Sequence, residues 1–157
     1  MKYLAIYLKD HHAGSTTGIE LAKRAAKNAR DDAECGPGLA QLATEIDEDR
    51  EALIRMMERL GVSPDRVKSG LFWAAEKAGR LKPNGHLRQP SPLSRLVEVE
   101  GLLGGVSGKL SLWRALLVVA HDEPRLEAAE LGRLAERAED QLARLHGLRD
   151  VAAARIA

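Results

Sequence analysis

The apolar pattern between residues 92 and 120 constrains the fold of this chain more than any other feature. Large apolar residues recur there in a strict alternation of three and four positions: Leu96, Val99, Leu103, Val106, Leu110, Trp113 and Leu117. This spacing places all of them on one face of a long helix. The Ser91–Pro92 pair supplies a capping side chain and a proline suited to the first helical turn. Because so long an apolar face must be covered, the pattern predicts a bundle of helices.

Other segments carry the same helical period. The spacing predicts helices over residues 2–33, over Leu39–Leu60 with Gly61 as the stop, over 64–81 after a second Ser-Pro start, and from a cap at Asp122 almost to the C-terminus. Aromatic residues make up only 3% of the chain, which suits helices better than strands. Two helical hairpins joined by a crossover of about thirty residues, with a short helix in it, describe a ferritin-like four-helix bundle. We therefore expect one all-α domain over residues 1–157.

Glycines gather in two of the predicted helices. Residues 9–24 read KDHHAGSTTGIELAKR, and residues 101–109 read GLLGGVSGK, so that glycines lie four apart at 14 and 18, at 101 and 105, and at 104 and 108. Each glycine weakens a helix by about 1 kcal/mol relative to alanine. We interpret the glycines as a close crossing of the two helices, since small residues let backbones approach. The alternative is a kink or break at residues 14–18.

The histidines test whether the bundle carries a di-iron centre. Ferritin-like di-metal proteins use Glu-x-x-His motifs, and none of the five histidines here has a glutamate three positions before it. An atypical carboxylate-rich site for Mn or Fe remains as the alternative. Its candidate ligands are the imidazoles and acids near the apolar stripes: His11, His12, Glu20, Glu45, Asp49, Glu98 and Glu100.

Asp49 interrupts the apolar stripe of the second helix, and Glu45 lies one turn before it. The simpler interpretation is that Asp49 is buried and pairs with an arginine, because a buried charge needs a partner. The arginines that we consider are Arg24, Arg114 and Arg137.

Charge is balanced overall at +1 but unevenly distributed. Residues 61–95 hold seven cations and two anions, whereas residues 39–60 hold six acids and three arginines. We expect the crossover to lie on the acidic helix or on that of a partner subunit. Binding of anions or nucleic acid would use the basic crossover residues Arg66, Lys68, Arg80, Lys82 and Arg88. Only Phe72 and Trp73 are near for base stacking, so the sequence argues against nucleic acid.

The cellular setting is inferred from cysteine content and hydropathy. Cys35 is the only cysteine and cannot form an intrachain disulfide, which fits a reducing cytoplasm. It follows a glutamate and precedes Gly-Pro-Gly, a turn in which we expect the thiol to be exposed. We find no apolar stretch of membrane-spanning length and expect no membrane partner.

Five phrases together resemble a bacterial family of small all-helical proteins. They are DHHAGSTTGIELAKRAA (10–26), EIDEDREAL (45–53), EKAGRLKPNG (76–85), SPLSRLVEVEGL (91–102) and GKLSLWRAL (108–116). The resemblance spans nearly the whole chain and implies an outline similar to ferritin-like bundles, without an activity to carry over. We therefore predict a non-enzymatic cytoplasmic bundle that acts by self-association or by binding a protein partner, with metal binding as the alternative.

Overall fold

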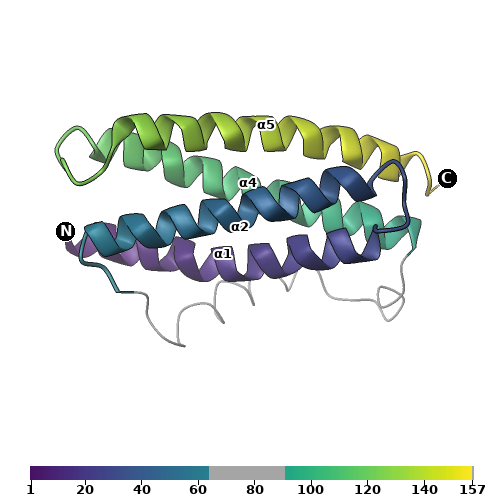
Figure 1. Ribbon diagram of the computed structural model, residues 1–157, viewed down its shortest axis with the longest axis horizontal. Helices are drawn as coiled ribbons and strands as arrows, with labels where there is room; N and C mark the ends of the chain where they lie inside the picture. Colours follow the sequence, from purple (N-terminus) through teal and green to yellow (C-terminus); the bar gives the residue numbers. More distant parts are fainter. Residues whose placement is uncertain (64–90, 157) are drawn as a thin grey trace.

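The computed structural model describes residues 1–63 and 91–156, which form four helices and no strand. They are α1 (Lys2–Asn28), α2 (Gly36–Arg59), α4 (Pro92–Val119) and α5 (Ala128–Ala153). Figure 1 shows the four helices side by side along the long axis of the molecule. The prediction of an all-α fold is confirmed. The predicted helix at 64–81 lies outside the described residues.

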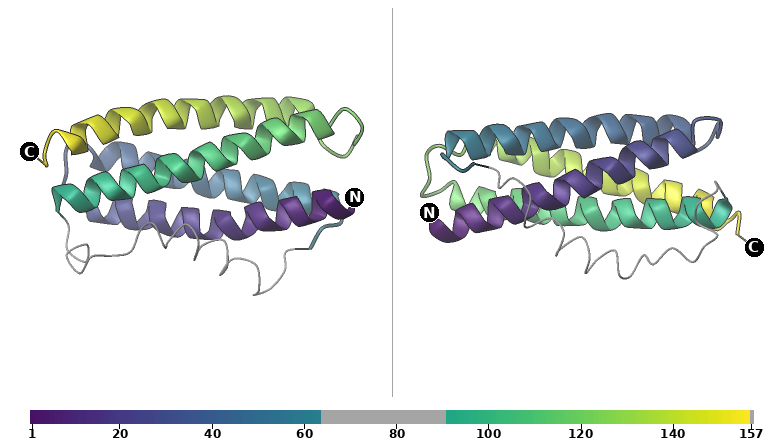
Figure 2. Two further views of the ribbon diagram at one scale, coloured as in Figure 1. Left: turned by 180° about the vertical axis from the view of Figure 1, so that it is seen from behind. Right: turned by 90° about the horizontal axis from the view of Figure 1, so that it is seen from below.

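The helices form two hairpins, α1–α2 and α4–α5, and α1 also packs against α4. Two hydrogen bonds show which helix ends lie together at each end of the bundle. At one end the Arg125 guanidinium, in the α4–α5 turn, donates to the Leu60 carbonyl just after α2 (3.4 Å). At the other end Arg95, at the start of α4, donates to the Asn28 carbonyl at the end of α1 (2.9 Å). The chain therefore passes from one end of the bundle to the other between Ser63 and Ser91, and α1 and α4 run in opposite directions (Figures 1 and 2).

The start of α4 is as the sequence predicts. Ser91 caps the helix by accepting a hydrogen bond from the Ser94 amide (3.1 Å), and the Ser94 hydroxyl accepts one from the Ser91 amide (2.8 Å). Of the predicted stripe, four residues are buried and Leu96, Leu103 and Leu117 are half-buried. The buried face is wider than that stripe, because it also includes Leu102, Leu112 and Leu116.

One expectation about α4 needs correction. The expectation was that no apolar stretch reaches membrane-spanning length. By length and composition, however, Pro92–Val119 is long and apolar enough to cross a membrane. One third of its most apolar window is buried inside the bundle. Such a helix is weak evidence for a membrane, because the core helix of a soluble protein meets the same two conditions.

The predicted apolar stripe of α2 is confirmed, but its first turn differs from the prediction. The residues that recur at helical spacing in this segment are all buried: Leu39, Leu42, Ile46, Asp49, Leu53, Met56 and Leu60. The helix begins at Gly36 rather than Leu39, because Pro37 fits the first turn of a helix. A Cβ on Gly36 would lie 2.5 Å from the Ala29 carbonyl oxygen, so glycine is needed where the α1–α2 turn closes. Cys35 is buried beneath this turn, and the expectation of an exposed thiol is wrong.

The predicted limits of α1 and α5 are also corrected. α1 ends at Asn28 instead of residue 33. α5 begins after Glu127, and the predicted cap Asp122 lies exposed in the turn before it. That turn is organised by Glu123, which accepts hydrogen bonds from the Arg125 amide (3.2 Å) and guanidinium (2.8 Å).

The glycines of α1 and α4 do not mark a tight helix crossing at the positions that can be judged. α1 continues without a break through residues 13–18, so the predicted alternative of a break is wrong. α1 does pack against α4, but a Cβ on Gly18, Gly104, Gly105 or Gly108 would meet no atom of the described residues within 4 Å. At these four positions the missing side chain leaves open space instead of admitting a neighbouring backbone.

Asp32 holds the α1–α2 turn to the C-terminal end of the chain. Its Oδ1 accepts hydrogen bonds from the Glu34 and Cys35 amides (both 3.1 Å), and its Oδ2 accepts one from Arg155 (2.7 Å). The Arg155 hydrogen bond, helped by the two amides, holds the pKa of Asp32 well below its ordinary value. The carboxylate therefore contributes to stability above about pH 4, the pKa of an unfolded aspartate, and this contribution is lost as the pH falls below it.

We expect Asp32→Asn to lower the free energy of unfolding at pH 7 by about 1–2 kcal/mol, because a charged hydrogen-bond acceptor becomes neutral. The difference between the variant and the wild type should shrink steadily as the pH is lowered from 5 to 2 in urea denaturation. Asp31→Asn is the control, since Asp31 is an exposed neighbour whose ion pair is with the adjacent, exposed Arg30. An Asp32→Asn effect of equal size at both ends of the pH range would contradict the assignment.

Candidate functional site

Polar and charged side chains meet inside the bundle where α2, α4 and α5 face one another. We call this group the inner cluster, and its members are Glu45 and Asp49 of α2, Lys109 of α4, and Arg137, Gln141 and Arg144 of α5. The members on α2 are one helical turn apart, and successive members on α5 are also about one turn apart. The two sets of side chains therefore meet at matching positions along the two helices. Two of its members, Asp49 and Gln141, are buried.

Asp49 is at the centre of the inner cluster. Its side chain is completely buried, and its two oxygens are bound from two other helices. Lys109 of α4 and Arg137 of α5 each form an ion pair with it, and the Gln141 amide donates to it as well (3.2 Å). The prediction that Asp49 is buried and pairs with an arginine is thereby confirmed, and the arginine is Arg137. The other two candidates, Arg24 and Arg114, pair elsewhere, with Glu98 and Glu139.

Gln141 connects the two acids of the cluster. It is fully buried, its Oε1 accepts a hydrogen bond from Lys109 (2.5 Å), and its Nε2 donates to Glu45 (3.1 Å) and Asp49. Glu45 also forms an ion pair with Arg144. Both ends of the buried amide are therefore used, as burial of a polar group requires.

The cluster's protonation reflects burial and mutual pairing. Burial lowers the pKa of Lys109, and the adjacent Asp49 carboxylate opposes this by favouring the ammonium form. Burial raises the pKa of Glu45, but hydrogen bonds from Arg144 and Gln141 outweigh it and leave the pKa below its ordinary value. Each charged group of the cluster thus faces a group of opposite charge, and the arrangement ties three helices together.

The predicted metal ligands are only partly brought together. Glu45 and Asp49 converge, but around cations of the chain itself. His11 and His12 are half-buried on α1, where His11 packs edge-on against Tyr7 (ring centroids 4.6 Å apart). The remaining three acids lie apart from them: Glu20 and Glu100 are exposed, and Glu98 accepts a hydrogen bond from Asn28.

No three His, Cys, Asp or Glu side chains are grouped to hold an ion within residues 1–63 and 91–156. An Mn or Fe site therefore stays a prediction. The basic crossover residues proposed for anions or nucleic acid lie outside the described residues.

Three members of the inner cluster were not expected from the sequence: Lys109, Gln141 and Arg144. Lys109 is the only charged residue between Glu100 and Arg114, and a single lysine in an apolar helix is a signal of a buried ion pair. Gln141 gave no such signal, because it sits among the polar and apolar alternations that fill α5.

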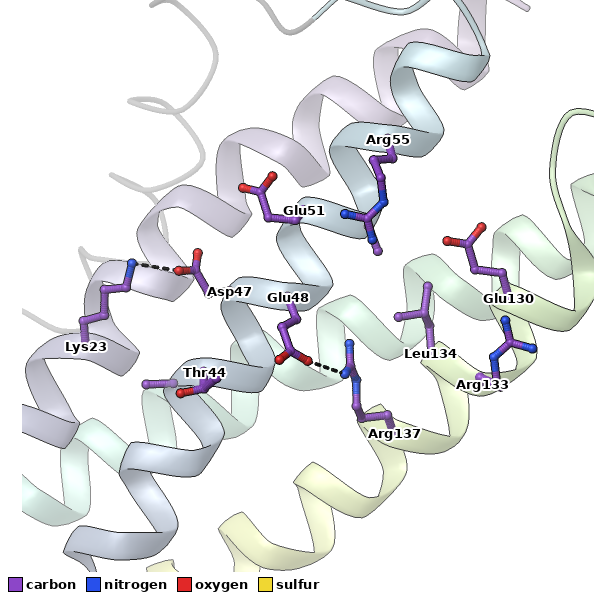
Figure 3. Close-up of a pocket in the computed structure, with 12 residues that line it drawn as sticks. Lys23, Thr44, Asp47, Glu48, Glu51, Arg55, Glu130, Arg133, Leu134 and Arg137 are labelled. Carbon is purple, nitrogen blue, oxygen red and sulfur yellow. Dashed lines mark hydrogen bonds and ion pairs between the residues drawn. The ribbon is translucent and has the colours of Figure 1, made fainter.

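A solvent-facing cleft of about 880 Å³ lies beside the inner cluster, between α2 and α5 (Figure 3). The residues that line it are Lys23, Ala43, Thr44, Asp47, Glu48, Glu51, Ala52, Arg55, Glu130, Arg133, Leu134 and Arg137. Arg137 belongs to both the cleft and the cluster, because it binds Glu48 at the rim (2.8 Å) and Asp49 beneath. The two helices are joined across this seam mainly by long charged side chains.

Comparison with known proteins adds no relative to this picture. The chain matches no protein-family model, no curated protein and no solved structure. The resemblance to a family of small helical proteins therefore stays a prediction, and function has to be argued from the geometry.

Proposed function

We propose that this protein is a non-enzymatic, ferritin-like helical bundle of the cytoplasm that acts by association, first of all with a second copy of itself. The observation that carries the proposal is a set of large apolar side chains left exposed at one end of the bundle. Tyr3 of α1 is 83% exposed and Val118 of α4 is 76% exposed. Met1, which precedes α1, and Ile6 in its second turn are exposed as well.

These side chains come from two helices that pack together. The start of α1 lies at the same end of the bundle as the end of α4, because the Arg125 guanidinium reaches both Met1 (3.7 Å to Sδ) and Leu60. Exposed apolar side chains gathered in one region of a surface mark sites of protein association. The inner cluster supports a structural interior, since each of its charged side chains is paired with a side chain of opposite charge from another helix.

The ferritin-like topology is the finer part of the proposal. It is supported by the opposite directions of α1 and α4 and by a connection that crosses the full length of the bundle between Ser63 and Ser91. A short helix over 64–81 would complete the arrangement.

Sedimentation of the purified chain over a range of micromolar concentrations tests the association. We expect a dimer that dissociates on dilution, and we expect the double variant Tyr3→Asp, Val118→Asp to be a monomer at every concentration, because buried carboxylates in an apolar interface are costly. Circular dichroism should show unchanged helix content, since both side chains are exposed.

Leu93→Asp is the matched control. Leu93 is also an exposed apolar residue of α4, 54% accessible, but it lies at the opposite end of the helix. The control should sediment like the wild type. A wild type that is monomeric throughout, or a control that dissociates as fully as the double variant, would contradict association through the Tyr3–Val118 end.

A further inference from the structure

Two arginines that line the cleft between α2 and α5 have no partner of their own. Arg55 extends from α2 and Arg133 from α5, and both are exposed. Neither side chain makes an ion pair or hydrogen bond within the part of the chain that the structure describes. In Figure 3 the Arg55 guanidinium projects into the space between the helices, and Arg133 lies on the opposite wall next to Leu134.

The acids of the same cleft are all neutralised. Each of its four carboxylates has a cation partner, in the pairs Lys23–Asp47 (3.0 Å), Arg137–Glu48 (2.8 Å), Arg50–Glu51 (3.3 Å) and Arg59–Glu130 (2.6 Å). Two of these cations, Arg50 and Arg59, do not line the cleft at all. Within residues 1–63 and 91–156, the guanidinium groups of Arg55 and Arg133 therefore have no ion-pair partner, and they lie on facing walls of the cleft.

We propose that this cleft is a binding site for a small organic dianion, either a dicarboxylate or a phosphate monoester. A guanidinium group matches carboxylate and phosphate oxygens with two parallel hydrogen bonds, and two guanidinium groups match two negative charges. The apolar floor formed by Ala43, Ala52 and Leu134 suits a carbon skeleton between or beside the acidic groups. The volume falls in the range of small-molecule sites.

The inference is independent of self-association, because the cleft lies between α2 and α5 and the exposed apolar end involves α1 and α4. It also differs from the predicted anion site, which used the crossover residues. Because the arginines on the two walls of the cleft would bind the ligand through their charge, added sodium chloride should weaken binding.

Titration calorimetry with the full chain tests the site, using glutarate, phenyl phosphate and acetate as probes. We expect saturable binding of at least one of the two dianions and at least about tenfold weaker binding of acetate, which carries one charge. The tighter of glutarate and phenyl phosphate identifies the acidic group that the arginines prefer.

The double variant Arg55→Gln, Arg133→Gln keeps most of each side chain's length and removes both charges. Its affinity for the dianion should fall by about tenfold or more, while thermal unfolding should show that the fold is kept, since both positions are exposed. Arg114→Gln is the control, because Arg114 is an exposed arginine whose ion pair with Glu139 lies outside the cleft. Absence of saturable dianion binding in the wild type, equal binding of acetate, or an unchanged affinity in the double variant would each overturn the proposal.

Discussion

Replacing Asp49 by leucine is expected to lower the free energy of unfolding by about 3–5 kcal/mol, one of the two largest effects of a single substitution in this chain. The leucine has a suitable volume, so the cost comes from charge. Lys109 would lose its buried carboxylate partner, and its side chain is 14% exposed, so that little water could replace Asp49. Chemical denaturation followed by circular dichroism measures the effect.

A double-mutant cycle separates this cost from packing. Lys109→Met should recover a large part of the stability lost in Asp49→Leu, because the buried ammonium is removed and Arg137 can still pair with Glu48 at the rim. Glu48→Gln is the control, since it removes an exposed partner of the same arginine and should cost no more than about 1 kcal/mol. Strictly additive effects of Asp49→Leu and Lys109→Met would show that the two side chains do not depend on each other.

Trp113→Ala is the second substitution with a large expected effect, about 3–5 kcal/mol. Trp113 is the largest fully buried side chain in the described structure and sits on the face of α4 that the other helices cover. Its truncation opens a cavity that rigid helices on several sides cannot fill. Urea denaturation should register the loss, and Ser111→Ala, at an exposed position of the same helix, should change stability by no more than about 0.5 kcal/mol.

Trp113→Phe sharpens the same prediction. The indole Nε1 is buried without a hydrogen-bond partner in the structure, so phenylalanine removes a poorly satisfied polar atom together with some packing. We expect Trp113→Phe to cost clearly less than Trp113→Ala. Equal losses in the two variants would mean that the site does not depend on ring volume.

The helices were predictable because their apolar residues repeat with the period of a helix. Every residue that this period placed on the inner face of α2 is buried, although the buried face also includes Ala43, Ala52 and Met57. The same period made Asp49 stand out as an acid on an apolar face. The rule that a buried charge needs a partner then selected a short set of arginines, and Arg137 was among them. Periodicity says which face is buried and which residues on it are anomalous.

The partners across helices were harder to predict, because they depend on the heights at which separate helices meet. Lys109 joins Asp49 from 60 positions away and Gln141 from 92 positions away, and no local pattern encodes these meetings. The prediction that the glycines mark a close helix crossing was wrong for a related reason. Gly18 and Gly105 were expected to mark a contact, yet glycine spacing describes only the surface of each helix and leaves the distance between the axes undetermined.

The inner cluster also fixes how the helices are aligned along their length. Asp49 and Glu45 are one turn apart on α2, and Arg137, Gln141 and Arg144 are spaced by three or four positions on α5. Sliding α2 along α5 by a single turn, about 5.4 Å, would bring one of these acids to the place of the other and put leucine or alanine at one of the two places where a carboxylate now meets its cations. An apolar seam would tolerate such a shift, whereas this one makes the neighbouring alignments of α2 and α5 costly and so favours one of them.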